Sequence, residues 1–219
     1  MSLPMALPLP VRNRLNDLIL AAFDDPDAKG VLVALEGFCR GETSEPLLAL
    51  DFFHRGPDGA VRLSPWAEPH GGAICERARA YQEGLARAER LPPQECSDPM
   101  IRAALLFDTR CYFETHEILE PLWMRAEGPE RQALQGLIQV AVGFQHLANG
   151  NVVGSRLLLE EGLGRLKANG SILDVALGGW IEGVTRCLHE IVALGARAAN
   201  AFDWGKVPMW PVRESFLSR

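Results

Sequence analysis

The chain has 219 residues, of which 47% are hydrophobic and 23% are charged, and its formal net charge is -6. This length and balance are sufficient for a sizeable hydrophobic core. An acidic chain without a basic stripe offers little attraction to phosphate backbones or to anionic lipid surfaces. We therefore expect neither a nucleic-acid partner nor a membrane partner.

The five cysteines are scattered, and no two of them have C-x-x-C spacing. An odd number of dispersed cysteines is more typical of reduced thiols than of a disulfide framework or a zinc knuckle. The sequence also has no segment with the features of a secretory signal and no run of about eighteen apolar residues. These observations predict reduced cysteines and a cytoplasmic location.

The N-terminal part of the chain is expected to be helical with a short β element. Apolar spacing and turn residues predict a helix over 11–23 that ends at 24–27, a hairpin or loop pair over 47–63, and a helix over 73–91. The apolar run over 31–35 fits a strand and a buried helix equally well. Pro92 and Pro93 then break the chain. We place a domain boundary there, between an N-terminal extension (1–95) and a helical bundle domain (96–219).

The second part gives stronger helical signals. Ser97-Asp98-Pro99 combines capping residues with a proline that is tolerated in the first turn of a helix. Helices are predicted over 100–108, 111–126, 130–148, 152–167 and 180–199. The aromatic tail over 202–210 is expected to pack on them, because exposing two tryptophans is costly. The expected fold class is all-α: an antiparallel bundle of helix pairs, with an N-terminal extension that has room for a small β-hairpin.

The helix predicted over 111–126 carries polar side chains on its inner face. At about 100° per residue, His116 and Glu120 fall between two apolar arcs, one turn apart, and Glu117 lies near the edge. The opposite, solvent-like face carries Glu114, Pro121 and Arg125. An imidazole and two carboxylates in this arrangement are able to bind a divalent metal or to act as general acid and base.

The next helix has an unusual lack of charge. No Asp, Glu, Lys or Arg occurs from Gln132 to Ser155, and a helix without charges is expected to be enclosed on nearly all sides. Its polar residues form a narrow stripe of Gln135, Gln139 and His146, beside Gly136 and Gly143, whose heptad spacing would let another helix approach closely. Leaving one buried polar group unpaired costs roughly 1–3 kcal/mol. We therefore predict that this stripe faces His116, Glu117 and Glu120 in one polar site.

The same residues also fit a purely structural role, with no metal or ligand bound. A His-Glu pair on a helix is often only a hydrogen-bonded pair, and a Gln/His stripe is also typical of a seam between two copies of a helix. Three such residues are a weaker signal than H-E-x-x-H, which places two imidazoles on one helix face. The sequence leaves both interpretations open.

Three segments resemble the domain of unknown function 309 family. Residues 107–123 are similar to the opening of that small helical domain, 134–141 to its central helix and 150–154 to its next turn. The resemblance covers about residues 100–166. The residues that match the family pattern are His116, Glu117, Glu120, Trp123, Gln135, Gln139 and Asn151.

The resemblance implies an all-helical fold and no established biochemical role. The family is sometimes labelled a predicted metal-dependent hydrolase, on the basis of the same His-Glu-x-x-Glu pattern. Two positions depart from it. Arg110 stands where the family usually has glycine in the turn between helices, and Asp108 replaces a usual asparagine and adds a carboxylate.

The sequence is therefore consistent with two functions. In the first, the protein is a metal-dependent hydrolase in which His116 and Glu120 bind a divalent cation and Glu117 activates a water. The remaining site residues, in a supporting or ligand-binding role, are Gln135, Gln139, His146, Trp123, Asn151 and Asp108. In the second, the protein is a non-enzymatic interaction or dimerisation module without a cofactor, and the same residues form a structural hydrogen-bond network. We expect a homo-oligomer in either case, and the sequence does not identify a small-molecule substrate.

Overall fold

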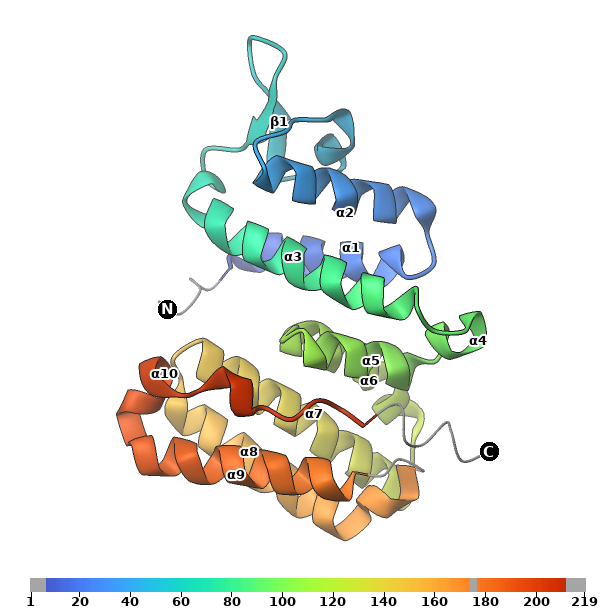
Figure 1. Ribbon diagram of the computed structural model, residues 1–219, viewed down its shortest axis with the longest axis vertical. Helices are drawn as coiled ribbons and strands as arrows, with labels where there is room; N and C mark the ends of the chain where they lie inside the picture. The colour runs from blue at the N-terminus through green and yellow to red at the C-terminus, as the bar shows by residue number, and fades with distance from the viewer. Residues whose placement is uncertain (1–6, 174–176, 212–219) are drawn as a thin grey trace. The chain divides into compact units, whose positions relative to one another are not determined.

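The structure is a computed structural model that describes residues 7–173 and 177–211 (Figure 1). The described chain is helical except for one short hairpin, which confirms the expected fold class. It divides into two compact units, an N-terminal unit that ends at Cys96 and a C-terminal unit that begins at Ser97. Among the described residues, no helix combines the length and the apolar character needed to cross a membrane.

Helix α2 is the central helix of the N-terminal unit, and it packs against both α1 and α3. The helices of this unit are α1 (Leu9–Ala22), α2 (Pro26–Cys39), α3 (Gly71–Ala88) and α4 (Pro93–Cys96), with the 3₁₀ helices η1 (Glu45–Ala49) and η2 (Glu68–His70). The ambiguous run over 31–35 is therefore helical. The side chain of Asp25 accepts a hydrogen bond from the backbone N of Asp27 (2.9 Å), and Pro26 occupies the first turn. Asp25 and Pro26 therefore start a second helix in addition to ending the first, which is all that the sequence analysis predicts for 24–27.

The predicted hairpin is formed by β1 (Phe53–Arg55) and β2 (Val61–Leu63), which pair antiparallel with Phe53 opposite Leu63. Gly59 closes the turn at φ 82°, and its N–H donates to the carbonyl of Gly56 over 2.9 Å. Phe53, Val61 and Leu63 are buried, so one face of the hairpin contributes to the core of the unit.

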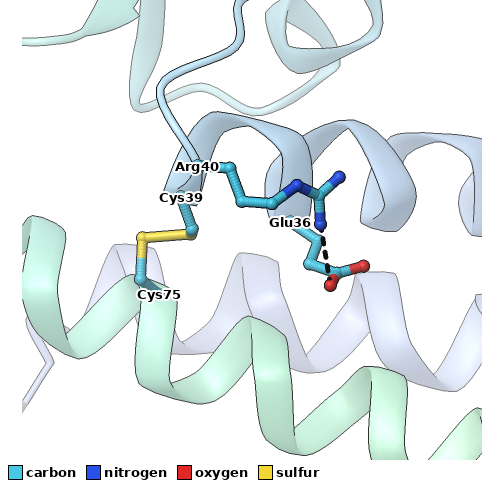
Figure 2. The surroundings of a disulfide bond; sticks show 4 residues. All are labelled: Glu36, Cys39, Arg40 and Cys75. Atoms are coloured by element: carbon cyan, nitrogen blue, oxygen red, sulfur yellow. Dashed lines mark ion pairs between the residues drawn. A yellow bond between two sulfur atoms is a disulfide. The ribbon is translucent and has the colours of Figure 1, made fainter.

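A disulfide joins α2 to α3, which contradicts the prediction that all cysteines are reduced. The sulfur atoms of Cys39 and Cys75 lie 2.11 Å apart, and both residues are half-buried (Figure 2). Arg40, beside Cys39, forms an ion pair of 2.9 Å with Glu36 on the preceding turn. The cysteine spacing could not reveal the bridge, because the partners are 36 residues apart and are brought together only by the packing of α2 on α3.

Consecutive helices of the C-terminal unit pack on one another from α5 to α9. They are α5 (Pro99–Asp108), α6 (Tyr112–Arg125), α7 (Gly128–Ala148), α8 (Val152–Asn169), α9 (Gly178–Leu194) and α10 (Ala198–Ala201), with the 3₁₀ helices η3 (Gly170–Leu173), η4 (Gly195–Arg197) and η5 (Trp204–Lys206). The predicted helix over 180–199 is too long at its C-terminal end. Helix α9 ends at Leu194 because Gly195 adopts φ 55°, a left-handed conformation that favours glycine.

Helices α7 and α8 make a close contact through glycines, as the sequence predicted. A Cβ atom on Gly136 would lie 2.9 Å from the carbonyl oxygen of Gly162, and one on Gly143 would lie 2.9 Å from Cγ of Leu159. No residue of α7 from 132 to 148 is exposed, which confirms that this charge-free part of the helix is enclosed. Figure 1 shows α7, α8 and α9 arranged side by side.

The C-terminal tail packs on the bundle, which confirms the prediction for residues 202–210. Phe202 and Trp210 are buried, and the backbone N of Trp210 donates to Oδ1 of Asp108 over 2.7 Å. The tail thereby adds Trp210 to an aromatic cluster around Phe107.

The turn between α5 and α6 depends on Arg110, which has a φ of 63°. Among the described residues, Arg110 is the only non-glycine with a positive φ. The left-handed conformation costs a residue with a side chain roughly 1–2 kcal/mol. The turn therefore keeps a backbone conformation suited to glycine, although an arginine occupies it.

Candidate metal centre

Three side chains of α6 converge on one point. His116, Glu117 and Glu120 are half-buried, and each offers one ligand atom within 4.8 Å of the others. The side chains of His116 and Glu117 are 26% and 30% exposed, and Nδ1 of the imidazole lies 3.2 Å from Oε1 of the carboxylate. No other group of three His, Cys, Asp or Glu side chains has this geometry in the part of the chain that the structure describes.

Hydrogen bonds hold both ends of α6. At its start, Oγ1 of Thr115 donates to the carbonyls of Cys111 (2.9 Å) and Ala103 (3.4 Å), and the second of these lies on α5. At its end, the guanidinium of Arg131 donates to the carbonyl of Trp123 over 3.1 Å and lies 4.2 Å from the centre of the Trp123 ring. The three converging side chains are thus carried by a helix whose ends are tied to its neighbours, and Trp123 belongs to that support.

Gln139 of α7 finds its partners on α8, so the predicted meeting with the α6 cluster is wrong for this residue. Nε2 of Gln139 donates to Oε2 of Glu161 (2.7 Å), and its Oε1 accepts from Nε of Arg165 (3.0 Å). Arg165 also donates to Oε1 of Gln132. Helix α7 packs on both α6 and α8. A helical wheel shows which residues share a face of α7, but it does not show which of the two neighbouring helices that face contacts.

The other predicted supporting residues bond away from the α6 cluster. His146 and Asn151 pair at the turn between α7 and α8, with Nδ1 of the imidazole 2.8 Å from the amide Nδ2. Oδ1 of Asn151 caps α8 by accepting from the backbone N of Gly154 over 2.9 Å. Asp108 holds the tail, and Gln135 is half-buried on α7. The structure therefore brings together His116, Glu117 and Glu120, and it gives Gln139, His146, Asn151 and Asp108 structural bonds.

Three further charged residues belong to this region although the sequence pattern does not indicate them. Glu114 was assigned to the solvent-like face of α6 but is only 1% exposed. Glu161 and Arg165 were overlooked because charged residues on a helix usually indicate a solvated face. Their spacing of four residues, opposite a helix with buried amides, is the signal that could have identified them.

Residues 100–158 match the model of the family described as Domain of unknown function (DUF309). This segment, called the DUF309 segment below, is similar to that family. The match confirms the resemblance, and it includes the three converging residues of α6. It ends before Glu161 and Arg165, so the α8 partners of Gln139 lie outside the DUF309 segment. No curated protein and no solved structure matches the chain.

Replacing Gln139 with leucine is expected to lower the free energy of unfolding by about 1–2 kcal/mol, because the hydrogen bonds to Glu161 and Arg165 are lost. Urea denaturation measures the change. Gln145→Leu is the matched control on the same helix, since half-buried Gln145 makes a solvent-exposed hydrogen bond to Asn149 at the end of the helix, and we expect less than about 0.5 kcal/mol for it. Equal effects of the two substitutions would show that the α8 contacts of Gln139 contribute nothing.

Proposed function

We propose that the DUF309 segment is a metal-dependent hydrolase that binds a divalent metal ion through His116 and Glu120 and uses Glu117 as the general base. The observation that carries this proposal is the convergence of one imidazole and two carboxylates within 4.8 Å on a single helix. All three side chains are half-buried, so they are partly shielded but remain accessible to an ion from solvent.

The donor set favours a transition metal. Imidazole nitrogen suits zinc and related ions, carboxylate oxygen suits manganese as well, and a mixed set suits Mg²⁺ and Ca²⁺ less well because these cations prefer oxygen ligands. Side chains from one helix cover one side of an ion. Such a site leaves coordination positions open for water and substrate, as catalytic metal sites do.

Each residue has a distinct role in this proposal. His116 and Glu120, one helical turn apart, hold the ion. A divalent cation at such a site supplies Lewis acidity and makes a nearby water more acidic. Glu117 accepts the proton of that water, and its carboxylate, 3.2 Å from Nδ1 of His116, also orients the imidazole.

Metal binding is tested on protein purified without a metal-affinity tag, by calorimetric titration with Zn²⁺ and Mn²⁺ and by elemental analysis. We expect one ion per chain, and His116→Ala should weaken binding by roughly 100-fold, since it removes the single nitrogen ligand. His189→Ala is the matched control. His189 is exposed and is followed by Glu190, the same dipeptide. This glutamate pairs with Lys206 over 2.8 Å, and no third ligand joins the pair among the residues that the structure describes.

Unfolding curves of both variants establish that any loss of metal reflects the site and not the fold. Absence of stoichiometric metal, or equal affinity in His116→Ala and the wild type, would end the proposal. Glu117→Gln then separates binding from chemistry. It should abolish hydrolysis of simple phosphate and carboxylate esters while the chain still binds metal. A chain that binds metal but hydrolyses none of these esters would instead support the non-enzymatic alternative.

The second candidate is a helical module without enzymatic activity, and the Gln139–Glu161–Arg165 network favours it. That network joins α7 to α8 within one chain and supports a structural role for the Gln139 amide. Three further expectations stay predictions: that the protein is a homo-oligomer, that it is cytoplasmic, and that it has no nucleic-acid or membrane partner.

A further inference from the structure

Helix α8 carries apolar side chains on two opposite faces. Its inner face packs on α7 through Gly162, and Leu159 and Leu166 are buried there. On the outer face, Val153 and Leu157, one helical turn apart, are 66% and 46% exposed. In the described part of the chain, no other helix has two large apolar side chains that are this exposed. A helix that is apolar on opposite faces is usually covered on both, so this outer face is expected to meet a partner.

Gly164 adds a small, open position to the same face, about three helical turns beyond Val153. It is exposed, and a Cβ atom built on it would meet nothing within 4 Å. Its φ is not positive, so neither the packing nor the backbone conformation of this chain requires glycine. Gly162 differs, because a Cβ atom there would lie 2.8 Å from the carbonyl oxygen of Gly136. Glycine destabilises a helix interior, and close approach of a second helix would give Gly164 a role.

One edge of this outer face carries opposite charges. The side chains of Arg156 and Glu160 are 47% and 45% exposed, and they form a loose ion pair of 3.8 Å. In a second α8 that packs antiparallel about a two-fold axis near residue 158, each Arg156 faces the partner's Glu160. The same axis places Val153 over the partner's Gly164, because the midpoint of 153 and 164 nearly coincides with that of 156 and 160. The charges and the shapes therefore favour the same alignment.

We propose that two copies of this chain form a two-fold symmetric dimer through antiparallel α8 helices. Leu157 of each copy lies at the centre of this α8 seam, between the two Arg156–Glu160 pairs that join the copies. None of these residues belongs to the metal cluster, so the proposal is independent of the proposed hydrolase. One pair of helices forms a small interface, and we therefore expect the dimer to dissociate on dilution.

Sedimentation equilibrium of the whole chain over a roughly hundredfold range of concentration measures the dissociation constant of the dimer. Leu157→Lys should raise that constant at least roughly tenfold, because it places two like charges at the centre of the α8 seam. Val33→Lys is the matched control, since Val33 is 52% exposed on α2 of the N-terminal unit, and it should not change the constant. Unfolding curves establish that both variants fold.

Gly164→Leu separates association from folding. Leucine favours a helix more than glycine does, and the space beside Gly164 within the chain is open, so the unfolding midpoint should stay unchanged or rise. The added side chain would collide with the partner's Val153, so the dissociation constant should rise roughly tenfold or more. A variant that is at least as stable as the wild type but dimerises more weakly cannot owe that loss to misfolding.

A charge exchange tests the alignment of the two helices. Arg156→Glu alone and Glu160→Arg alone should each weaken self-association roughly tenfold, because like charges then meet across the α8 seam. An equimolar mixture of the two variants should form a heterodimer with nearly the affinity of the wild type, because every contact again joins opposite charges. A wild type that is monomeric at all concentrations, or a Leu157→Lys variant that dimerises as the wild type does, would overturn the proposal. A mixture that associates no better than either variant alone would also overturn it.

Discussion

Phe107→Ala is expected to lower the free energy of unfolding of the C-terminal unit by about 3–5 kcal/mol, the usual range for removing a buried aromatic side chain. The ring is 1% exposed and meets other rings edge-on. Its partners, at centroid distances of 5.2–5.9 Å, are Tyr112, Phe144, Trp180 and Trp210. These rings come from α6, α7, α9 and the tail, so one truncation leaves a cavity shared by four segments.

Urea denaturation followed by tryptophan fluorescence measures this loss, since Trp180 and Trp210 both contact the ring. Phe107→Leu is the matched control, because leucine keeps most of the apolar volume and loses the edge-on contacts, each worth about 0.5–1.5 kcal/mol. It should cost clearly less than alanine. A loss below about 1.5 kcal/mol for Phe107→Ala would mean that the site collapses around the missing ring and that the cluster is not central to the core.

Cys39→Ser is expected to lower the stability of the N-terminal unit by about 4 kcal/mol. Cys39 and Cys75 are 36 residues apart in the sequence. Closing a loop of that length removes conformational entropy from the unfolded chain, which stabilises the folded state by about 4 kcal/mol at room temperature. Unfolding of the wild type is compared with and without a thiol reductant. The reduced wild type should behave like Cys39→Ser, and the variant should not respond to the reductant.

Cys96→Ser is the control in the same unit, because Cys96 lies outside the disulfide, and it should change stability by no more than about 1 kcal/mol. Intact-mass measurement after alkylation counts the reactive thiols under each condition. A wild type whose unfolding is unaffected by reductant, with Cys39 and Cys75 both alkylated beforehand, would contradict the bridge.

Local signals predicted most of the helices correctly. The capped start at Ser97-Asp98-Pro99 and the apolar spacing of the helices predicted over 100–167 depend on neighbours in sequence, and the structure confirms them. The run over 31–35 was undecided because five apolar residues fit strand and helix alike. Only the capped start at Asp25 and Pro26, five to six residues before that run, indicates that the run belongs to a helix.

The sequence predicts which side chains of one helix lie together in the candidate site, but it does not predict which side chains of different helices meet. The spacing of His116, Glu117 and Glu120 on α6 was sufficient to place the three side chains together. The partner of Gln139 depended on whether its stripe meets α6 or α8, and periodicity carries no information on that choice. The disulfide is a similar case, because pairing of Cys39 with Cys75 follows from tertiary packing. Its presence also removes the cysteine-based argument for a reducing compartment.

The glycine contact between α7 and α8 has a consequence for how the C-terminal unit folds. Gly136 and Gly162 leave room for close approach at one alignment of the two helices only, since sliding α8 by one turn would bring Arg165 or Leu166 toward the space that Gly162 now fills. The two helices are adjacent in the chain and joined by a short turn, so this pairing closes with little loss of chain entropy. The α7–α8 hairpin is therefore suited to act as the folding nucleus on which α6 and α9 later assemble.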